Sequence, residues 1–291
     1  MNVGTVSITT RLRTWVFVAG LTALLIGAGA LAGGVFLYAF VALAVVMNLA
    51  GYWFSDRIAL KASRARPLSE TEAPGLHATV AELCVRAEIP KPRLFLIDSE
   101  QPNAFATGRN REHAAVAVTR GLLAMPPEQV RGVIAHELAH IRNRDVLVAS
   151  IAAMIAGAIS AIANVLQLSF LFGGDDDESP LGWIGVIATL VLAPIAATLL
   201  QLAVSRQREY LADATAARLL GGGGPLAEAL ETLERGTKAA PVAVNPAFAS
   251  LYIANPLPRA GLAGLFSTHP PIAERVRRLR GYDAGAAVQT A

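Results

Sequence analysis

The feature that most constrains the fold is a stretch from Thr14 to Phe54 that contains no charged residue. It is about twice the roughly 20 residues that a helix needs to cross a bilayer, so it predicts two spans joined by a tight turn near Gly27 to Gly34. An alternative interpretation takes residues 1 to about 32 as a cleavable signal peptide. The second uncharged half, which follows at once, favours an uncleaved hairpin.

Two further apolar stretches lie at about 147–172 and 183–204, on either side of an acidic turn. The chain is 54% hydrophobic and 16% charged, with a mean hydropathy of +0.47, which is too apolar for an ordinary soluble domain. The pattern predicts four spans in two hairpins. The expected segments are a first hairpin (1–55), an α+β part (56–146), a second hairpin (147–204) and a helical part (205–291).

Basic residues flank the outer ends of all four predicted spans. They are Arg11, Arg13, Arg57, Lys61, Arg64, Arg66, Arg142, Arg144, Arg206 and Arg208. By the positive-inside rule both termini and everything outside the hairpins are cytoplasmic, which predicts a cell-membrane protein in contact with the lipid bilayer. These flanks account for most of the net charge of +3, so we expect no nucleic-acid partner.

The water-facing part has an α+β pattern. The expected elements are a helix at 70–89, strands at 93–98 and 114–118, and a helix that begins at Pro126 and Pro127. The segment 103–108 between the strands reads as a loop, and 239–264 as a long irregular segment broken by prolines. The single cysteine, Cys84, shares an apolar helical face and is expected in the core.

A short motif carries the chemistry: His136, Glu137 and His140 form an HExxH box. Residues four apart on a helix share a face, so the two imidazoles can bind one zinc ion while Glu137 acts as a general base. The chain has 5 histidines, and an accidental box is expected on the order of one time in a hundred or less. The motif predicts a zinc peptidase.

A catalytic zinc ion takes three protein ligands, so the box needs a partner. His77, His113, His269 and the carboxylates after the second hairpin are available. Glu209 directly follows the fourth predicted span, on the same side as the HExxH helix, and Asp213 is one helical turn further on. This spacing suits a ligand and an acceptor that fixes an imidazole, and it suits a solvated helix start equally well.

Four segments resemble the HtpX-type membrane metalloproteases, which are relatives of the CaaX-prenyl zinc proteases. They are PNAFATG at 102–108, the block 134–145 with HELAHIRNRD, SRQREYLAD at 205–213 and STHPP at 267–271. The resemblance covers nearly the whole chain. It implies a multi-pass α-helical membrane protein with a cytosolic, zincin-like α+β metalloprotease domain.

The resemblance also implies residue roles. Glu209 is the third ligand of one Zn²⁺ per chain, Asp213 supports a ligating histidine, and His269 and Arg275 line the cleft, where they stabilise the oxyanion. The residues implied to hold an extended substrate are Asn103, Ala104, Ala115, Val116, Ala117 and Val118. From the residues alone, 115–118 is either an edge strand that pairs with substrate or an ordinary core strand.

The expected activity is hydrolysis of peptide bonds in misfolded or damaged membrane proteins on the cytosolic side, in quality control under stress. One alternative is a sequence-specific processing protease of the CaaX-prenyl type. Another is a non-enzymatic, zinc-binding membrane scaffold. A transporter is disfavoured because the predicted spans carry no ionisable residue at membrane depth. The sequence does not specify the oligomeric state.

Overall fold

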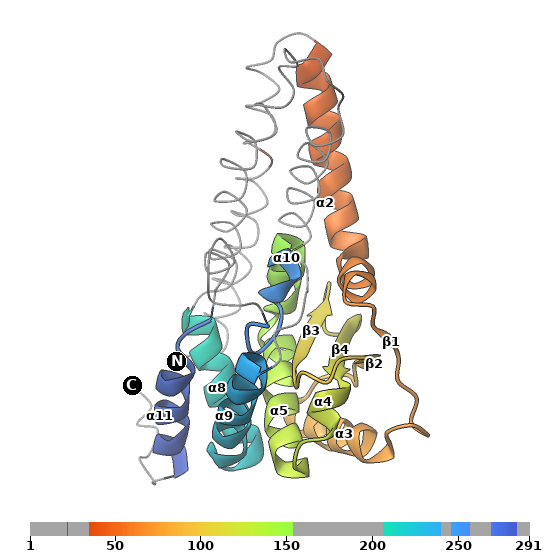
Figure 1. Cartoon of the computed structure of the whole chain (residues 1–291). Helices are drawn as coiled ribbons and strands as arrows, with labels where there is room; N and C mark the ends of the chain where they lie inside the picture. Colours follow the sequence, from red (N-terminus) through yellow and green to blue (C-terminus); the bar gives the residue numbers. More distant parts are fainter. Residues whose placement is uncertain (1–21, 23–34, 154–205, 240–245, 257–268, 284–291) are drawn as a thin grey trace, which may run out of the picture.

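The computed structural model describes residues 22, 35–153, 206–239, 246–256 and 269–283. A long helix rises away from a mixed layer of helices and strands (Figure 1). In chain order the elements are α2 (Val35–Ala62), β1 (Arg66–Pro67), α3 (Pro74–Ala87), β2 (Arg93–Ile97), β3 (Ala104–Gly108), β4 (Ala114–Thr119), α4 (Arg120–Leu123), α5 (Pro127–Asn143), α8 (Arg206–Leu220), α9 (Gly224–Ala239), α10 (Pro246–Ala249) and α11 (Ile272–Asp283).

The four strands form one sheet in the order β1-β2-β4-β3. Strand β4 runs parallel to β2 and antiparallel to β3, and β1 is antiparallel to β2. The predicted strands at 93–98 and 114–118 are confirmed as β2 and β4. The segment 103–108 was expected to be a loop, and that expectation is wrong, because its small residues pair with β4 as β3.

Strand β4 separates two cores because successive side chains of a strand point to opposite faces. Val116 and Val118 pack in the larger core with α3, α5, α8, α9 and α11. Ala115 and Ala117 face the other way, into a smaller core with the end of α2, the helical residues 146–153 and the chain around Phe248. The sheet is therefore covered on both faces, and Cys84 lies in the larger core as expected.

Helix α5 crosses the larger core and carries the HExxH box. It begins at Pro127, as the sequence predicts, and ends where Arg144 adopts a left-handed conformation with φ 63°. Gly132 lies one turn before the box, against the start of α9: a Cβ there would lie 2.7 Å from the backbone nitrogen of Leu226. Only glycine permits this approach of α5 to α9 without a shift of the backbone.

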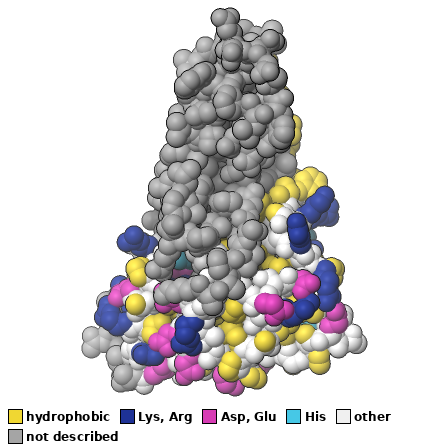
Figure 2. All heavy atoms as spheres, in the orientation of Figure 1, with side chains coloured by type: hydrophobic (Ala, Val, Ile, Leu, Met, Phe, Trp, Pro, Cys, Tyr) yellow, Lys and Arg dark blue, Asp and Glu magenta, His cyan; other side chains and the backbone are white. Residues whose placement is uncertain are grey.

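The predicted spans are only partly within the described residues. Three of them fall largely outside, and the second overlaps α2. In the described ranges, no helix has both the length and the apolar character required to cross a membrane. Several large apolar side chains of α2 are nevertheless exposed, including Tyr38, Val46 and Trp53. Figure 2 shows hydrophobic side chains beside basic ones at the upper right of the part that it colours.

Candidate metal centre

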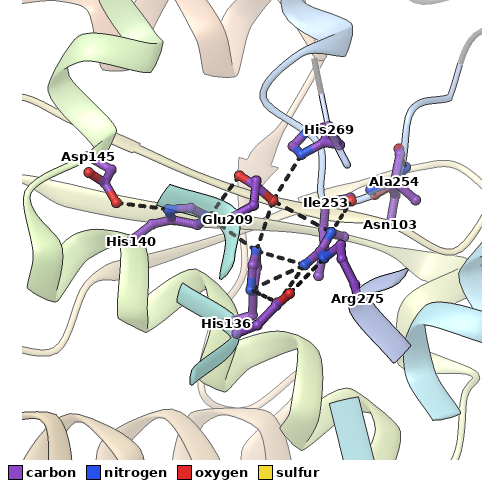
Figure 3. A network of polar contacts seen from close by, with 10 residues as sticks. Asn103, His136, His140, Asp145, Glu209, Ile253, Ala254, His269 and Arg275 are labelled. Atoms are coloured by element: carbon purple, nitrogen blue, oxygen red, sulfur yellow. Dashed lines mark hydrogen bonds and ion pairs between the residues drawn. The ribbon is translucent and has the colours of Figure 1, made fainter. Parts of the chain in front are cut away.

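Two helices bring the predicted ligands together (Figure 3). On α5, one helical turn separates His136 from His140, and their Nε2 atoms lie 3.1 Å apart. Helix α8 packs against α5 and supplies Glu209, whose Oε2 lies 3.7 Å from His136 Nε2 and whose Oε1 lies 3.5 Å from His140 Nε2. His136 and Glu209 are buried, and His140 is partly open to the cleft.

The residues present fit a divalent metal ion. One ligand atom from each of His136, His140 and Glu209 can be chosen so that all lie within 4.8 Å of one another. Two imidazole nitrogens and a carboxylate oxygen are a donor set that zinc uses at catalytic sites. Glu209 Oε2 is buried without a hydrogen-bond partner. His269 Nδ1 lies 3.0 Å and Arg275 Nη1 lies 3.5 Å from it, neither with hydrogen-bond geometry, so this oxygen keeps a lone pair that a metal ion can accept.

Burial and neighbouring charges tune the centre. Burial, together with the charge of Arg275, lowers the pKa of His136 to about 4, which keeps the ring neutral and able to bind metal. Burial opposes a proton on His140, but a hydrogen bond to Asp145 and the charge of Glu209 outweigh it and raise the pKa to about 9. These carboxylates favour positive charge at His140, which a metal cation can supply in place of a proton.

Glu137 points into the same cleft from α5. Burial, followed by the charge of Glu209, raises its pKa to about 7, while the backbone N–H of Ala106 on β3 donates a hydrogen bond to it. A carboxylate with a pKa near neutrality can accept a proton and release it again. The cleft has ≈ 480 Å³ of empty space, including its mouth, and is lined by the three ligand residues, Glu137, Ala106 and His269, among others.

The second nitrogen of each histidine faces an aspartate. His136 Nδ1 lies 3.0 Å from Asp213 Oδ1, and His140 Nδ1 lies 3.2 Å from Asp145 Oδ2. A carboxylate can only accept, so each Nδ1 carries a proton, which leaves each Nε2 as the nitrogen that can bind a metal ion. Asp213 stands where sequence reasoning expects it. Asp145 was missed, although it ends the matching block at 134–145, because nothing in the spacing distinguishes it from a solvated charge.

Arg275 does not line the cleft, contrary to expectation. It is fully buried on α11, and its Nε and Nη2 donate to Asp213 Oδ2 and Oδ1 at 2.9 and 2.7 Å. The guanidinium lies behind the metal centre and holds the carboxylate that faces His136. His269, just before α11, does line the cleft. Although only six residues separate them, His269 faces the cleft and Arg275 is buried behind the metal centre.

The residues expected to hold substrate also need correction. Strand β4, with Ala115, Val116, Ala117 and Val118, has β2 on one side and β3 on the other, so it is a core strand without an edge to offer. Asn103 is buried: its Nδ2 donates to Ala254 O at 2.7 Å, and Ala254 N donates back to its Oδ1 at 3.3 Å.

Strand β3 is the edge next to the centre. In the described part of the chain it has a strand on one side only. Ala104 accepts a backbone hydrogen bond from Ile253 at 3.0 Å, and Ala106 lines the cleft. Sequence reasoning included Ala104 but missed Ala106 and Ile253. The sequence motif at 103–108 was recognised, but its role at the cleft depends on Ile253, which is far away along the chain.

Comparison with known proteins agrees with this geometry. The profile of peptidase family M48 matches residues 70–283. The chain is 51% identical over 278 residues to "Protease HtpX homolog" of Syntrophobacter fumaroxidans, covering 93% of this chain and 98% of that one. It is 50% identical over 276 residues to the protein of the same name from Pelotomaculum thermopropionicum, covering 92% and 98%.

Among solved structures, the crystal structure of S. mikatae Ste24p is similar, with a TM-score of 0.48 and 21% identity, covering 94% of this chain and 66% of that one. The metal-binding geometry and the extended sequence similarity lead to one assignment. The chain belongs to peptidase family M48 and is a metalloprotease of the HtpX type.

Proposed function

We propose that the chain is a zinc endopeptidase in which His136, His140 and Glu209 hold one Zn²⁺. The observation that carries the proposal is the meeting of these three donors at the end of a cleft, with each imidazole oriented by a carboxylate. Bound zinc would supply Lewis-acid chemistry, polarising water and the scissile carbonyl. The other steps belong to the side chains around it.

Glu137 is the proposed general base. It takes a proton from the attacking water and delivers it to the leaving amine, and its pKa of about 7 suits both transfers. His269 lines the cleft opposite α5 and is the proposed donor to the oxyanion. Asp213 orients His136, and Arg275 fixes Asp213 from behind, so we assign Arg275 a positioning role.

We propose that an extended peptide adds to the edge of β3. Asn103 and Thr119 form a hydrogen-bonded pair, since Thr119 N donates to Asn103 O at 3.0 Å. Along an antiparallel ladder, hydrogen-bonded pairs alternate with non-hydrogen-bonded pairs. The backbone N–H and C=O groups of Ala104 and Ala106 therefore point away from β4. Ala104 already accepts from Ile253, and the N–H of Ala106 already donates to Glu137, so the carbonyl of Ala106 is the edge group to which a substrate N–H would donate. Asn103 and Ala104 then hold the cleft wall around 253–254.

We further propose a cell-membrane location with four spans, in the segments 1–55 and 147–204, and with the centre and both termini in the cytosol. The support is the hydropathy pattern, the basic flanks and the exposed apolar side chains of α2. Substrates would then be misfolded or damaged membrane proteins, cleaved in quality control under stress.

The test is cleavage of casein by detergent-purified protein with zinc, with chelator and as the Glu137→Gln variant. We expect cleavage that needs both zinc and Glu137. Zinc binding without cleavage in any detergent or lipid would refute the peptidase and favour a scaffold. A membrane-inserted reporter with a misfolded cytosolic loop, compared with a prenylated CaaX peptide, separates quality control from specific processing. Alkaline extraction of membranes tests the location.

A further inference from the structure

A second buried ion pair lies on the His140 side of the centre. Asp145 is 6% exposed and Arg208 is 8% exposed. Asp145 Oδ2 lies 3.2 Å from His140 Nδ1, while its Oδ1 lies 3.7 Å from Arg208 Nε. One carboxylate thus contacts a proposed metal ligand with one oxygen and a guanidinium with the other.

This arrangement repeats the one at His136, where Asp213 lies between the ring and Arg275. The two arrangements differ in where they lie relative to the cleft. Arg275 is fully buried behind the centre, whereas Asp145 and Arg208 both line the cleft. A buried carboxylate without a cation would be strongly disfavoured, so Arg208 makes it possible for Asp145 to be charged beside His140.

From this geometry we propose that Asp145 and Arg208 form a positioning pair for His140. Asp145 accepts the Nδ1 proton, which fixes the ring tautomer and turns Nε2 toward Glu209, and Arg208 fixes the rotamer of Asp145. The inference rests on the proposed function, because it treats His140 as a zinc ligand. Outer partners of this kind typically contribute about 10–100-fold in metal affinity.

The pair also connects parts of the chain that are far apart in sequence. Asp145 lies two residues after the end of α5, and Arg208 immediately precedes Glu209 on α8. The contact therefore sets the position of the helix that carries the third ligand relative to the helix that carries the first two. Loss of the contact between Asp145 and Arg208 would therefore displace His140 and Glu209 together.

The test is titration of the metal-depleted full-length protein in detergent with Co²⁺, followed by its visible absorption, and with Zn²⁺ against a chromophoric chelator. Asp145→Ala is expected to weaken Zn²⁺ binding about 10–100-fold and to alter the Co²⁺ spectrum. Asp145→Asn keeps an oxygen that accepts from Nδ1, so it is expected to retain the wild-type spectrum with a smaller loss. Glu231→Gln, which removes an exposed ion pair with Arg280, is the matched control.

Arg208→Gln should weaken binding in the same direction, and it should cost little in the Asp145→Ala background because both act through one contact. If the Zn²⁺ affinity of Asp145→Ala is within twofold of that of the wild type, the proposal that this pair positions His140 is overturned. Equal losses in Asp145→Ala and Asp145→Asn with unchanged Co²⁺ spectra would also overturn it, since a purely structural ion pair predicts that result. If Asp145→Ala does not fold, the Zn²⁺ affinities and Co²⁺ spectra of Asp145→Asn and Arg208→Gln test the proposal in its place. A wild-type protein that binds neither metal would refute the proposed function as well.

Discussion

Replacing Arg275 by Met should destabilise the fold far more than a change at an arginine of the same helix exposed to water. The side chain is fully buried and donates two hydrogen bonds to Asp213, which is itself 3% exposed. Removing one partner of a buried pair leaves an uncompensated charge and costs ~3–5 kcal/mol. At about 2–4 °C per kcal/mol for a chain of this size, the melting temperature should fall by about 6–20 °C.

The assay is thermal unfolding in detergent with chelator present, so that metal binding does not contribute. Arg277→Gln is the control, because Arg277 is 73% exposed and pairs only with Glu274 in the described residues; its loss should stay below ~1 kcal/mol. The double variant Asp213→Asn/Arg275→Met removes both members of this pair, although Glu209 still loses its contact with Arg275, and it should recover part of the loss. A melting temperature of Arg275→Met close to that of the control, with kcat alone reduced, would refute the positioning role and restore a role in the cleft.

Three further outcomes are expected. Gly132→Ala should lower the melting temperature, because the new Cβ would lie 2.7 Å from the backbone of α9. Gly75→Ala on α3 is the control: its Cβ meets nothing within 4 Å, so the free energy of unfolding should rise by ~0.5–1 kcal/mol. Equal shifts of the melting temperature in the two variants would refute the close-approach argument. Burial raises the pKa of Cys84 to about 11, so its thiol should resist iodoacetamide at pH 8 until denaturant is added, and rapid labelling of the folded protein would contradict this. Chelator should lower the melting temperature and zinc restore it, while Glu209→Gln should abolish that zinc response; a response that persists would exclude Glu209 as a ligand.

The local part of the fold could be predicted because its signals are local. The start of α5 at Pro127, the burial of Cys84 and the two strands at 93–97 and 114–119 each follow from nearby residues. Strand β3 could not, because Ala104 to Gly108 forms a strand only through pairing with β4, and its length and small side chains resemble a turn.

Long-range placement explains the other differences. Sequence reasoning located Arg275 near the centre but could not tell that it faces Asp213 and not the cleft, because that depends on how α11 packs on α8. The same limit applies to Asp145, whose partners His140 and Arg208 meet only when α5 and α8 lie side by side. The resemblance supplied candidate residues, and the packing of helices separated those that face the cleft from those that stand behind it.

The edge of β3 beside Glu137, which pairs with no further strand among the described residues, has a consequence for selectivity. Backbone N–H and C=O groups are common to nearly all residues, so a strand edge discriminates little among sequences. It does discriminate between backbone that is free and backbone already engaged in a helix or sheet, because the latter must first give up its own hydrogen bonds. Under the proposed mode of binding, a cleft bounded by this edge would respond to the loss of structure in a neighbouring protein, whatever the sequence of that protein.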